Sequence, residues 1–371
     1  MRDKIVLIDH EPFTKRRKEL FFVDRFFQEG YKFEVWSVAG LLKMPGTYID
    51  RVSDNYVFEI NTSKDLRERL NKEQLNRTIF IVEVNSDGWR VYNILKRYEL
   101  ITIRINFYAN TIGATYGQEN WIIRVFFKGN FKKLLIGKLC ELKISLIKKL
   151  GLLKDFDLFF SSKKEIGITN QINHPDYEKW RWGDNTKSLI NSKYFVFCDN
   201  FFPDHPDLQK YHYNINGALY RKTLCRFFGY LENLYNIPVI IAAHPKAIYT
   251  DSDWDNRQIV KYKTDELVRC AEGVIIHQSN SISYSILCDK PLCMITTDDY
   301  NRVTPLRAYF SAYKQLFDLP IYNLDHQNYE GIKFSKIEES KRKKYIYTYL
   351  TSPETQDLHN FDIINSVFKG L

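Results

Sequence analysis

The segment Pro238-Val-Ile-Ile-Ala-Ala-His-Pro-Lys246 indicates the fold of this chain of 371 residues. It begins with a short apolar run of the kind that fills a parallel sheet and ends in polar side chains. The segment Gly273-Val-Ile-Ile-His-Gln-Ser-Asn-Ser281 repeats this arrangement. Because ligands of open α/β sheets bind at the carboxyl ends of the strands, we expect both polar ends at one edge of a sheet.

Apolar runs and helix-type segments alternate along the rest of the chain, beginning with Ile5–Ile8 and then Phe13–Glu29. The polar stretch His174–Ser192 interrupts the alternation, which then starts again. This pattern predicts two Rossmann-like doubly wound α/β domains with parallel sheets facing a cleft, at residues 1–187 and 188–371. The expected strands are Ile5–Ile8, Tyr56–Ile60, Ile79–Val84, Ile101–Ile105, Asp157–Phe160, Tyr194–Cys198, Val239–Ala242, Ile259–Tyr262, Val274–Ile276 and Pro291–Ile295, and the C-terminal helices Ile337–Tyr349 and Phe361–Phe368 are expected on the outside.

The positive charge of the chain is concentrated in one segment. The formal net charge is +9, and 124–154 contains nine Lys or Arg residues against one acid, Glu141. The remainder is nearly neutral, which argues against a basic groove for nucleic acid. Leucines recur in this segment at spacings of three and four, between lysines, so it predicts a basic amphipathic helix that lies on an anionic membrane surface. The alternative is a helix that packs its leucines on the first domain.

The location expected for the protein is cytoplasmic, at the inner face of the cytoplasmic membrane. The N-terminus places charges before a short strand and lacks the apolar run of a secretory signal. No stretch approaches the ~20 apolar residues that cross a bilayer. The six cysteines are scattered, without metal-ligand spacing, and we interpret them as reduced core residues.

The two quoted segments contain the groups that hold a phosphate at a sheet edge. His244 and Lys246 provide an imidazole and a cation, and Pro245 fixes the turn between them. The second segment provides hydroxyls and the N–H groups of a helix start. The alternative is a purely structural role, in which a serine or Asn280 only caps that helix while His244 packs in a turn. The predicted nucleotide-binding residues are His244, Pro245, Lys246, Ser279, Asn280, Ser281 and Ser283.

The order of these motifs resembles the nucleotide-binding half of bacterial GT-B glycosyltransferases. The resemblance covers roughly residues 194 to 300 and lies in Ala243–Lys246, Thr264–Val268, His277–Ser283 and Asp289–Leu292. The pairing of H-P with a serine cluster is similar to sialyl-, polysialyl- and Kdo-transferases and to polymerases that use CDP-glycerol. It implies a cytidine nucleotide whose phosphate binds His244 and Ser279–Ser281. The opening Tyr194–Asp207 looks like capsule and O-antigen cluster proteins.

The resemblance also implies an acidic or imidazole base on the first domain if the reaction inverts. Glu83-Val-Asn-Ser-Asp-Gly88 resembles the acidic motif of the sialyltransferase-like families, with Asp87 as its candidate base, although Ser86 replaces the first acid. The other candidates are Asp9, His10 and Glu11, directly after the first strand. Asp87 is also suited to a helix cap and Asp9 to a turn. Further cleft candidates are His205, Thr264 and Asp298.

These observations predict a GT-B glycosyltransferase that needs no metal or cofactor. Its donor is expected to be a nucleotide-sugar, CMP-linked and of the Kdo or sialic type, and its acceptor a lipid-linked surface polysaccharide or lipopolysaccharide. The alternatives are a UDP- or GDP-hexose transferase, a CDP-glycerol glycerophosphotransferase, and a non-catalytic subunit that binds a nucleotide-sugar or glycan. No nucleic-acid partner is expected, and the oligomeric state stays open.

Overall fold

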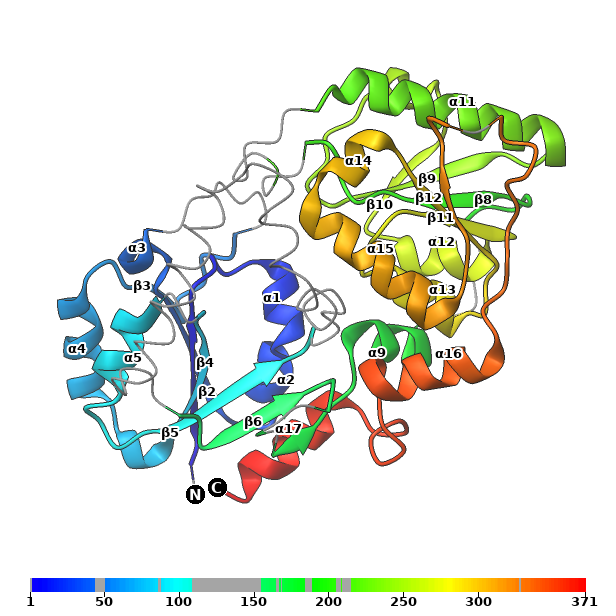
Figure 1. Cartoon of the computed structure of the whole chain (residues 1–371). Coiled ribbons are helices and arrows are strands. Elements are labelled where there is room, and N and C mark those ends of the chain that lie inside the picture. Colours follow the sequence, from blue (N-terminus) through cyan, green and yellow to red (C-terminus); the bar gives the residue numbers. More distant parts are fainter. Residues whose placement is uncertain are drawn as a thin grey trace, which may run out of the picture. The chain divides into compact units, whose positions relative to one another are not determined.

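The computed structural model describes residues 2–43, 51–85, 88–108, 155–164, 167, 169–183, 189–204, 208, 215–326 and 328–371. These residues form two compact units, each built on one parallel sheet (Figure 1). The first unit takes the described residues up to Asn173 and adds Glu354–Leu371. The second unit takes those of His174–Pro353. The expected fold class, with two doubly wound parallel sheets, is confirmed.

The first unit is built on seven strands. They are β1 (Lys4–Asp9), β2 (Lys32–Ser37), β3 (Val57–Glu59), β4 (Thr78–Glu83), β5 (Ile101–Asn106), β6 (Leu158–Ser161) and β7 (Asn170–Gln171). Their order in the sheet is β3-β2-β1-β4-β5-β6-β7, so the winding reverses between β1 and β4. Asp9, the last residue of β1, pairs with Ser37 of β2 and Glu83 of β4. The crevice where ligands bind in such sheets therefore lies beside Asp9 and Glu83.

Helices cover both faces of this sheet (Figure 1). They are α1 (Lys15–Leu20), α2 (Val23–Gln28), α3 (Ala39–Leu42), α4 (Ser63–Lys72), α5 (Trp89–Leu95) and α17 (Asn360–Lys369), with a 3-10 turn at Leu75–Arg77. Ile5 and Leu7 pack with residues of α2 and α17, whereas Val6 and Ile8 pack with residues of α4 and α5. Alternate residues of β1 thus reach opposite layers, as expected of a strand buried on both faces.

The first unit differs from the sequence prediction at the expected helix Phe13–Glu29 and at strand β2, among other elements. The expected helix Phe13–Glu29 is divided into α1 and α2, because Phe22 between them takes a left-handed conformation with φ of 53°. Strand β2 was not predicted, because Lys32 and Glu34 alternate with its first apolar residues and hide the apolar run. The sheet context, with β1 and β3 on either side, stabilises it as a strand.

The second unit is built on six strands that also pair only in parallel. They are β8 (Phe195–Cys198), β9 (Val239–Ala243), β10 (Ile259–Lys261), β11 (Gly273–Ile276), β12 (Leu292–Thr296) and β13 (Ile321–Asn323). Their order is β10-β9-β8-β11-β12-β13, so the winding reverses between β8 and β11. The two segments that indicated the fold form β9 and β11, one on each side of β8. Their polar ends therefore lie at the same sheet edge, as predicted.

The helices of the second unit surround this sheet. They are α9 (Pro175–Trp182), α11 (Gly217–Tyr235), α12 (Thr264–Cys270), α13 (Ile282–Leu287), α14 (Asp298–Arg302), α15 (Thr304–Phe317) and α16 (Glu339–Tyr345), with a 3-10 turn at Asp251–Trp254 and a π-helical turn at Ile346–Leu350. Figure 1 shows α11 on one side of the sheet and α12 on the other. Residues of both helices join one core cluster with the strands.

The units divide the chain differently from the expected domains 1–187 and 188–371. Helix α17 belongs to the first unit, since the rings of Phe361 and Phe368 lie 5.0 and 5.5 Å from that of Phe26. Helix α9 belongs to the second unit, since Tyr177 is part of its core. The assignment of the last helix to the second domain was therefore wrong, because its phenylalanines are buried against the first sheet.

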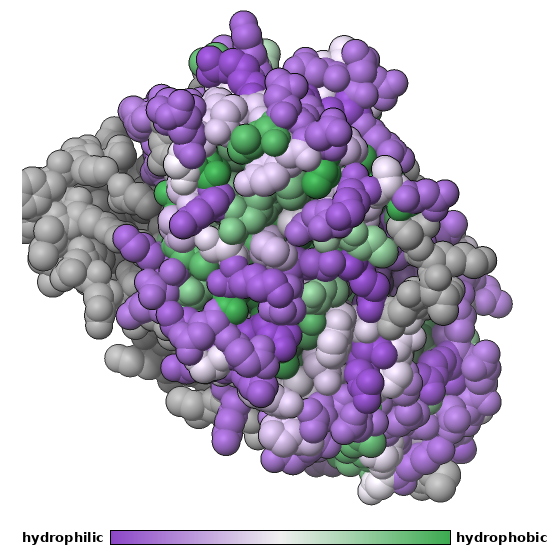
Figure 2. Space-filling model, turned by 90° about the vertical axis from the view of Figure 1, so that its right-hand side faces the viewer, coloured by the Kyte–Doolittle hydropathy of each residue, from purple (hydrophilic) through white to green (hydrophobic). Residues whose placement is uncertain are grey.

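The face drawn in Figure 2 is largely hydrophilic, with small hydrophobic areas separated by polar side chains. In the part of the chain that the structure describes, no helix is both long and apolar enough to cross a membrane. The basic segment 124–154 lies outside the described residues. Of the cysteines, Cys198, Cys225 and Cys293 are buried as predicted, whereas Cys270 is exposed.

Candidate functional site

The loop after β9 presents His244 in one defined tautomer. Its Nδ1 accepts a hydrogen bond from the backbone N–H of Lys246, at 3.1 Å. A ring nitrogen that accepts from an N–H carries no proton, so in the neutral ring the proton lies on Nε2. His244 is partly exposed, and Pro245 and Lys246 are exposed. The turn therefore combines an imidazole N–H donor with an ammonium group at a strand end, which is chemistry suited to an anion.

The turn after β11 contains the predicted serine cluster. Ser279 accepts from the backbone N–H of Ser281 at 3.2 Å, and the Ser279 carbonyl accepts from the Tyr313 hydroxyl at 3.1 Å. Asn280 is exposed, and the other two serines of this turn are partly exposed. Ser283 differs, because it is fully buried inside α13 and its hydroxyl has no hydrogen-bond partner among the described residues. In this structure Ser283 is therefore a core residue.

His277, directly after β11, is a buried structural residue. Its Nδ1 donates to the carbonyl of Ile295 at 2.7 Å, and its Nε2 lies 2.7 Å from the hydroxyl of Tyr220. Its ring stacks on Tyr300, with centroids 4.6 Å apart. Burial lowers the pKa of His277 to about 4, so the ring is neutral at physiological pH. These contacts fix His277 at the end of β11, where the serine turn begins.

Sequence reasoning did not select the loop after β8. Strand β8 lies between β9 and β11, the strands that lead into the two turns. Asp199 is almost fully buried, and burial raises its pKa to about 6. Its Oδ2 accepts from the backbone N–H of His244 at 3.2 Å. Asn200 donates to the carbonyl of Gln278 at 3.0 Å. The quoted motif Tyr194–Asp207 contained both residues, but nothing in the sequence indicated which loops they bind.

The remaining candidates of the second unit lie farther along the same edge. Asp298 begins α14 and accepts from Asn323 and His326, at 2.8 and 2.9 Å. The Asn323 hydrogen bond, the largest of several causes, lowers the pKa of Asp298. Thr264 is the first residue of α12, which follows β10. His205 lies outside the described residues.

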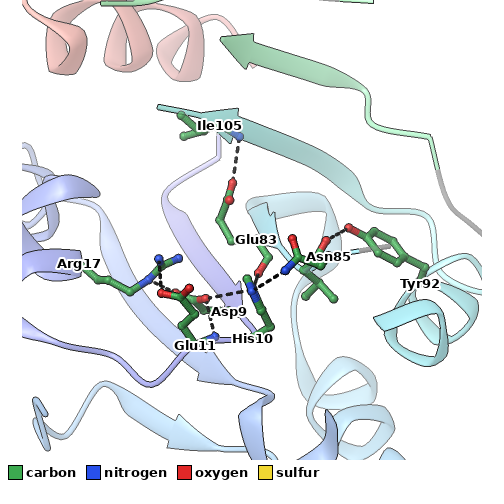
Figure 3. A network of polar contacts seen from close by, with 9 residues as sticks. Asp9, His10, Glu11, Arg17, Glu83, Asn85, Tyr92 and Ile105 are labelled. Carbon is green, nitrogen blue, oxygen red and sulfur yellow. Dashed lines mark hydrogen bonds and ion pairs between the residues drawn. The ribbon is translucent and has the colours of Figure 1, made fainter. Parts of the chain in front are cut away.

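In the first unit, Asp9 and Glu11 are both bound to Arg17 (Figure 3). Asp9 is fully buried and pairs with the Arg17 guanidinium, while Glu11 lies 3.0 Å from it. Burial raises the pKa of Asp9, and the positive charge of Arg17 partly offsets that rise. A buried carboxylate held by arginine is poorly placed to meet a substrate. The structure thus favours a structural role for Asp9.

His10 lies at the same edge in an orientation suited to accept a proton (Figure 3). Its Nδ1 bonds to the backbone carbonyl of Glu83, so Nδ1 must donate. Its Nε2 lies 2.9 Å from the Asn85 amide nitrogen and therefore accepts. The side chain is partly exposed. His10 thus presents an unprotonated Nε2 at the switch point of the first sheet, as a general base requires.

Glu83 is a further titratable group at this edge that sequence reasoning did not select. Burial raises its pKa to about 7, although the backbone N–H of Ile105 donates to its Oε1 at 3.0 Å. Arg17 and Arg104 lower the pKa, and Asp9 raises it. Asp87, the first-choice base in the sequence, lies outside the described residues. Within Glu83–Gly88, Glu83 is therefore the described acid whose pKa is shifted.

Two hollows of about 220 and 360 Å³ in the first unit lie away from these residues. Lys4 and Lys32, which begin β1 and β2, line both of them. They therefore lie at the amino end of the sheet, opposite to His10. Within the described residues, no group of three or more His, Cys, Asp or Glu side chains has a metal-binding arrangement.

No protein-family model and no curated protein matches this chain. Among solved structures it is similar to the spinosyn forosaminyltransferase SpnP, with 10% identity and a TM-score of 0.46 over 100% of this chain and 99% of that chain. It is also similar to the H548A variant of the wall teichoic acid polymerase TagF, with 11% identity and a TM-score of 0.49 over 100% and 90%. The UDP-GlcNAc 2-epimerase of Methanocaldococcus jannaschii has 11% identity and a TM-score of 0.47 over 100% of both chains. Neither substrate nor reaction follows from a likeness at this level.

Proposed function

We propose that this protein is a glycosyltransferase that moves a sugar from a nucleotide donor to an acceptor hydroxyl. The observation that carries the proposal is the edge of the second sheet, where His244 and the turn Ser279–Ser281 follow strands on either side of β8. An imidazole N–H, an ammonium group and serine hydroxyls at such an edge suit the phosphates of a nucleotide. The motif order that resembles GT-B glycosyltransferases supports the same assignment.

The donor that we propose is linked to a cytidine nucleotide. This finer assignment rests on the pairing of His244-Pro245 with Ser279–Ser281, which is similar to sialyl-, polysialyl- and Kdo-transferases. A UDP- or GDP-hexose, or CDP-glycerol, would present its phosphates to the same groups. Lys246 and His244 supply the charge and the donor that a leaving phosphate needs, so we propose transfer without a metal. Activity that is unchanged in excess EDTA is the expected result.

For the acceptor side we propose His10 as the base. In a displacement with inversion, Nε2 of His10 takes the proton of the acceptor hydroxyl, replacing its present contact with Asn85. The acceptor oxygen then bonds to the anomeric carbon while the bond from that carbon to the phosphate oxygen breaks. The phosphate leaves with the electron pair and is stabilised by His244 and Lys246. Asp87 stays the alternative base.

The acceptor that we propose is a lipid-linked glycan, such as a growing surface polysaccharide or lipopolysaccharide, at the cytoplasmic face of the membrane. The support is the composition of 124–154, where nine basic residues against one acid, at ~1 kcal/mol for each basic residue near the surface, suffice for reversible attachment to an anionic surface. Flotation with anionic liposomes tests it: deletion of 132–149 should abolish flotation. Unchanged flotation would contradict the membrane assignment.

A second candidate function is a non-catalytic subunit that binds a nucleotide-sugar. One observation favours it. Arg17 pairs with both Asp9 and Glu11, so neither of these two described candidate acids is unpaired and ready to act as a base. Such a subunit would bind nucleotide through His244 but release none from a nucleotide-sugar.

The test of the proposed function is a donor screen. The protein is incubated with CMP-, UDP- and GDP-sugars and CDP-glycerol, and the released nucleotide is measured by mass spectrometry. Release from a CMP-sugar that is lost in His244→Ala supports the full proposal. Release from a UDP- or GDP-sugar alone would overturn the cytidine assignment, and binding without release from any donor would favour the non-catalytic subunit.

A further inference from the structure

The loop after β8 lies between the two halves of the candidate phosphate site. Strand β8 pairs with β9 on one side and with β11 on the other. The loop that follows it, Asp199–Phe202, therefore has the His244 turn on one side and the Gln278–Ser281 turn on the other. Each half of the site is hydrogen-bonded to this loop. Asp199 bonds to the His244 turn, and Asn200 bonds to the Gln278–Ser281 turn.

Asp199 holds the His244 side. Its Oδ2 accepts from the backbone N–H of His244 at 3.2 Å and from the Tyr249 hydroxyl at 2.9 Å. Its Oδ1 accepts from the backbone N–H of Phe201 at 2.9 Å. Phe201 takes a left-handed conformation with φ of 61°, which is costly for a bulky residue, and its ring lies parallel to that of His244, 5.7 Å away. One carboxylate thus fixes both His244 and the ring beside it.

Asn200 holds the serine side. Its amide nitrogen donates to the backbone carbonyl of Gln278 at 3.0 Å and lies 2.6 Å from the Tyr300 hydroxyl. Its Oδ1 accepts from the backbone N–H of Phe202 at 3.3 Å. Gln278 directly precedes Ser279, so this contact sets the start of the serine turn.

We infer that Asp199 and Asn200 are positioning residues that set the spacing between His244 and the serine turn for a nucleotide phosphate. The inference rests on the proposed function of that site. Together the two side chains connect one central loop to both flanking loops, and a phosphate can contact both halves only if their separation is fixed.

The charge of Asp199 strengthens this inference. A carboxylate beside an anion site repels the ligand, so on charge alone an uncharged residue would serve better there. What the carboxylate adds is acceptor capacity, because Oδ1 and Oδ2 together receive three donors. An asparagine has one acceptor oxygen and would turn its NH₂ group toward a donor.

This argument gives a test in which charge and geometry predict opposite results. The dissociation constants of CMP, UDP and GDP are measured by calorimetry for the full chain and for Asp199→Asn, Asn200→Ala and Tyr249→Phe. Asp318→Asn is the matched control, since it removes an exposed acid of the same unit. Asp199→Asn should weaken binding about tenfold or more, as expected when a buried donor loses its acceptor. Asn200→Ala should weaken it several-fold, Tyr249→Phe about threefold, and Asp318→Asn not at all.

The outcomes separate this inference from the proposed function. If the unchanged chain binds none of the three nucleotides, the proposed function fails. If the unchanged chain binds but Asp199→Asn binds equally or more tightly, the carboxylate acts by charge or not at all, and the inference is wrong while the function stands. If Asp199→Asn does not fold, Asn200→Ala and Tyr249→Phe decide, and unchanged affinity in both would overturn the positioning role.

Discussion

The two sheet edges of this protein present side chains of opposite hydrogen-bonding character. At the first edge the Arg17 guanidinium binds the carboxylates of Asp9 and Glu11, and His10 presents an unprotonated nitrogen. At the second edge His244 presents a ring N–H beside an ammonium group, and the acid Asp199 is occupied by three donors. The same fold thus presents a hydrogen-bond acceptor in one unit and donors suited to an anion in the other.

The strand order alone therefore does not determine which chemistry a sheet edge presents. Both edges lie at switch points where α/β sheets bind ligands, between β1 and β4 and between β8 and β11. What distinguishes them is which ring nitrogen carries the proton. In His10 a carbonyl fixes the proton on Nδ1, whereas in His244 a backbone N–H fixes it on Nε2.

The largest effect is expected at the first edge. His10→Ala should lower the turnover rate about 10²- to 10⁴-fold, because that is the usual contribution of a positioned general base. Its nucleotide affinity should match that of the unchanged chain, since His10 belongs to the other unit. Steady-state kinetics with the donor found in the screen measures the rate. Turnover within threefold of the unchanged chain would remove His10 from the mechanism and favour Asp87.

The ion pair of the first edge gives the next largest effect. Arg17→Met should lower the free energy of unfolding by about 3–5 kcal/mol, because it leaves the buried carboxylate of Asp9 unpaired. Lys18→Met on the same helix is the control, since Lys18 pairs with an exposed Asp24 and should cost about 1 kcal/mol or less. Urea denaturation measures both. Equal destabilisation by the two variants would show that Arg17 has no special structural role.

Glu83 predicts a smaller, pH-dependent effect. Its pKa is about 7 in the folded chain against an ordinary value of 4.5, so the folded state keeps a proton that the unfolded state has lost. Stability should therefore fall as the pH rises from about 4.5 to 7. A glutamine cannot titrate, so the stability of Glu83→Gln should fall less than that of the unchanged chain over this pH range. Thermal melting at pH 5 and pH 7.5 measures it, and parallel pH curves for both proteins would contradict the assignment.

The sequence predicted the elements whose apolar runs are uninterrupted. Strands such as β1, β4, β9 and β11 are buried on both faces, so nearly every residue is apolar and the run is visible. Strand β2 was missed because polar residues begin it, and the C-terminal helix was assigned to the wrong unit. A sequence pattern shows that a helix face is apolar but not which core covers it.

The candidate sites were predictable only where a residue directly follows such a strand. His10 and His244 were selected for this reason, and both directly follow their strands, β1 and β9. Asp199 and Asn200 were not, because their importance depends on hydrogen bonds to loops that lie 45 and 78 residues away in the chain. Ser283 was selected for its hydroxyl, but the rotation of α13 buries it. Neither the partners across a sheet edge nor the rotation of a short helix can be read from residue types.

The most direct test of this division of tasks is nucleotide binding by His244→Ala and His10→Ala. Calorimetry with CMP, CDP, UDP and GDP is carried out on the unchanged chain and on both variants. The unchanged chain is expected to bind at least one of them, His244→Ala to lose most of that affinity, and His10→Ala to keep it. Loss of binding in His10→Ala with retention in His244→Ala would contradict this expectation, as would no binding of any nucleotide by the unchanged chain.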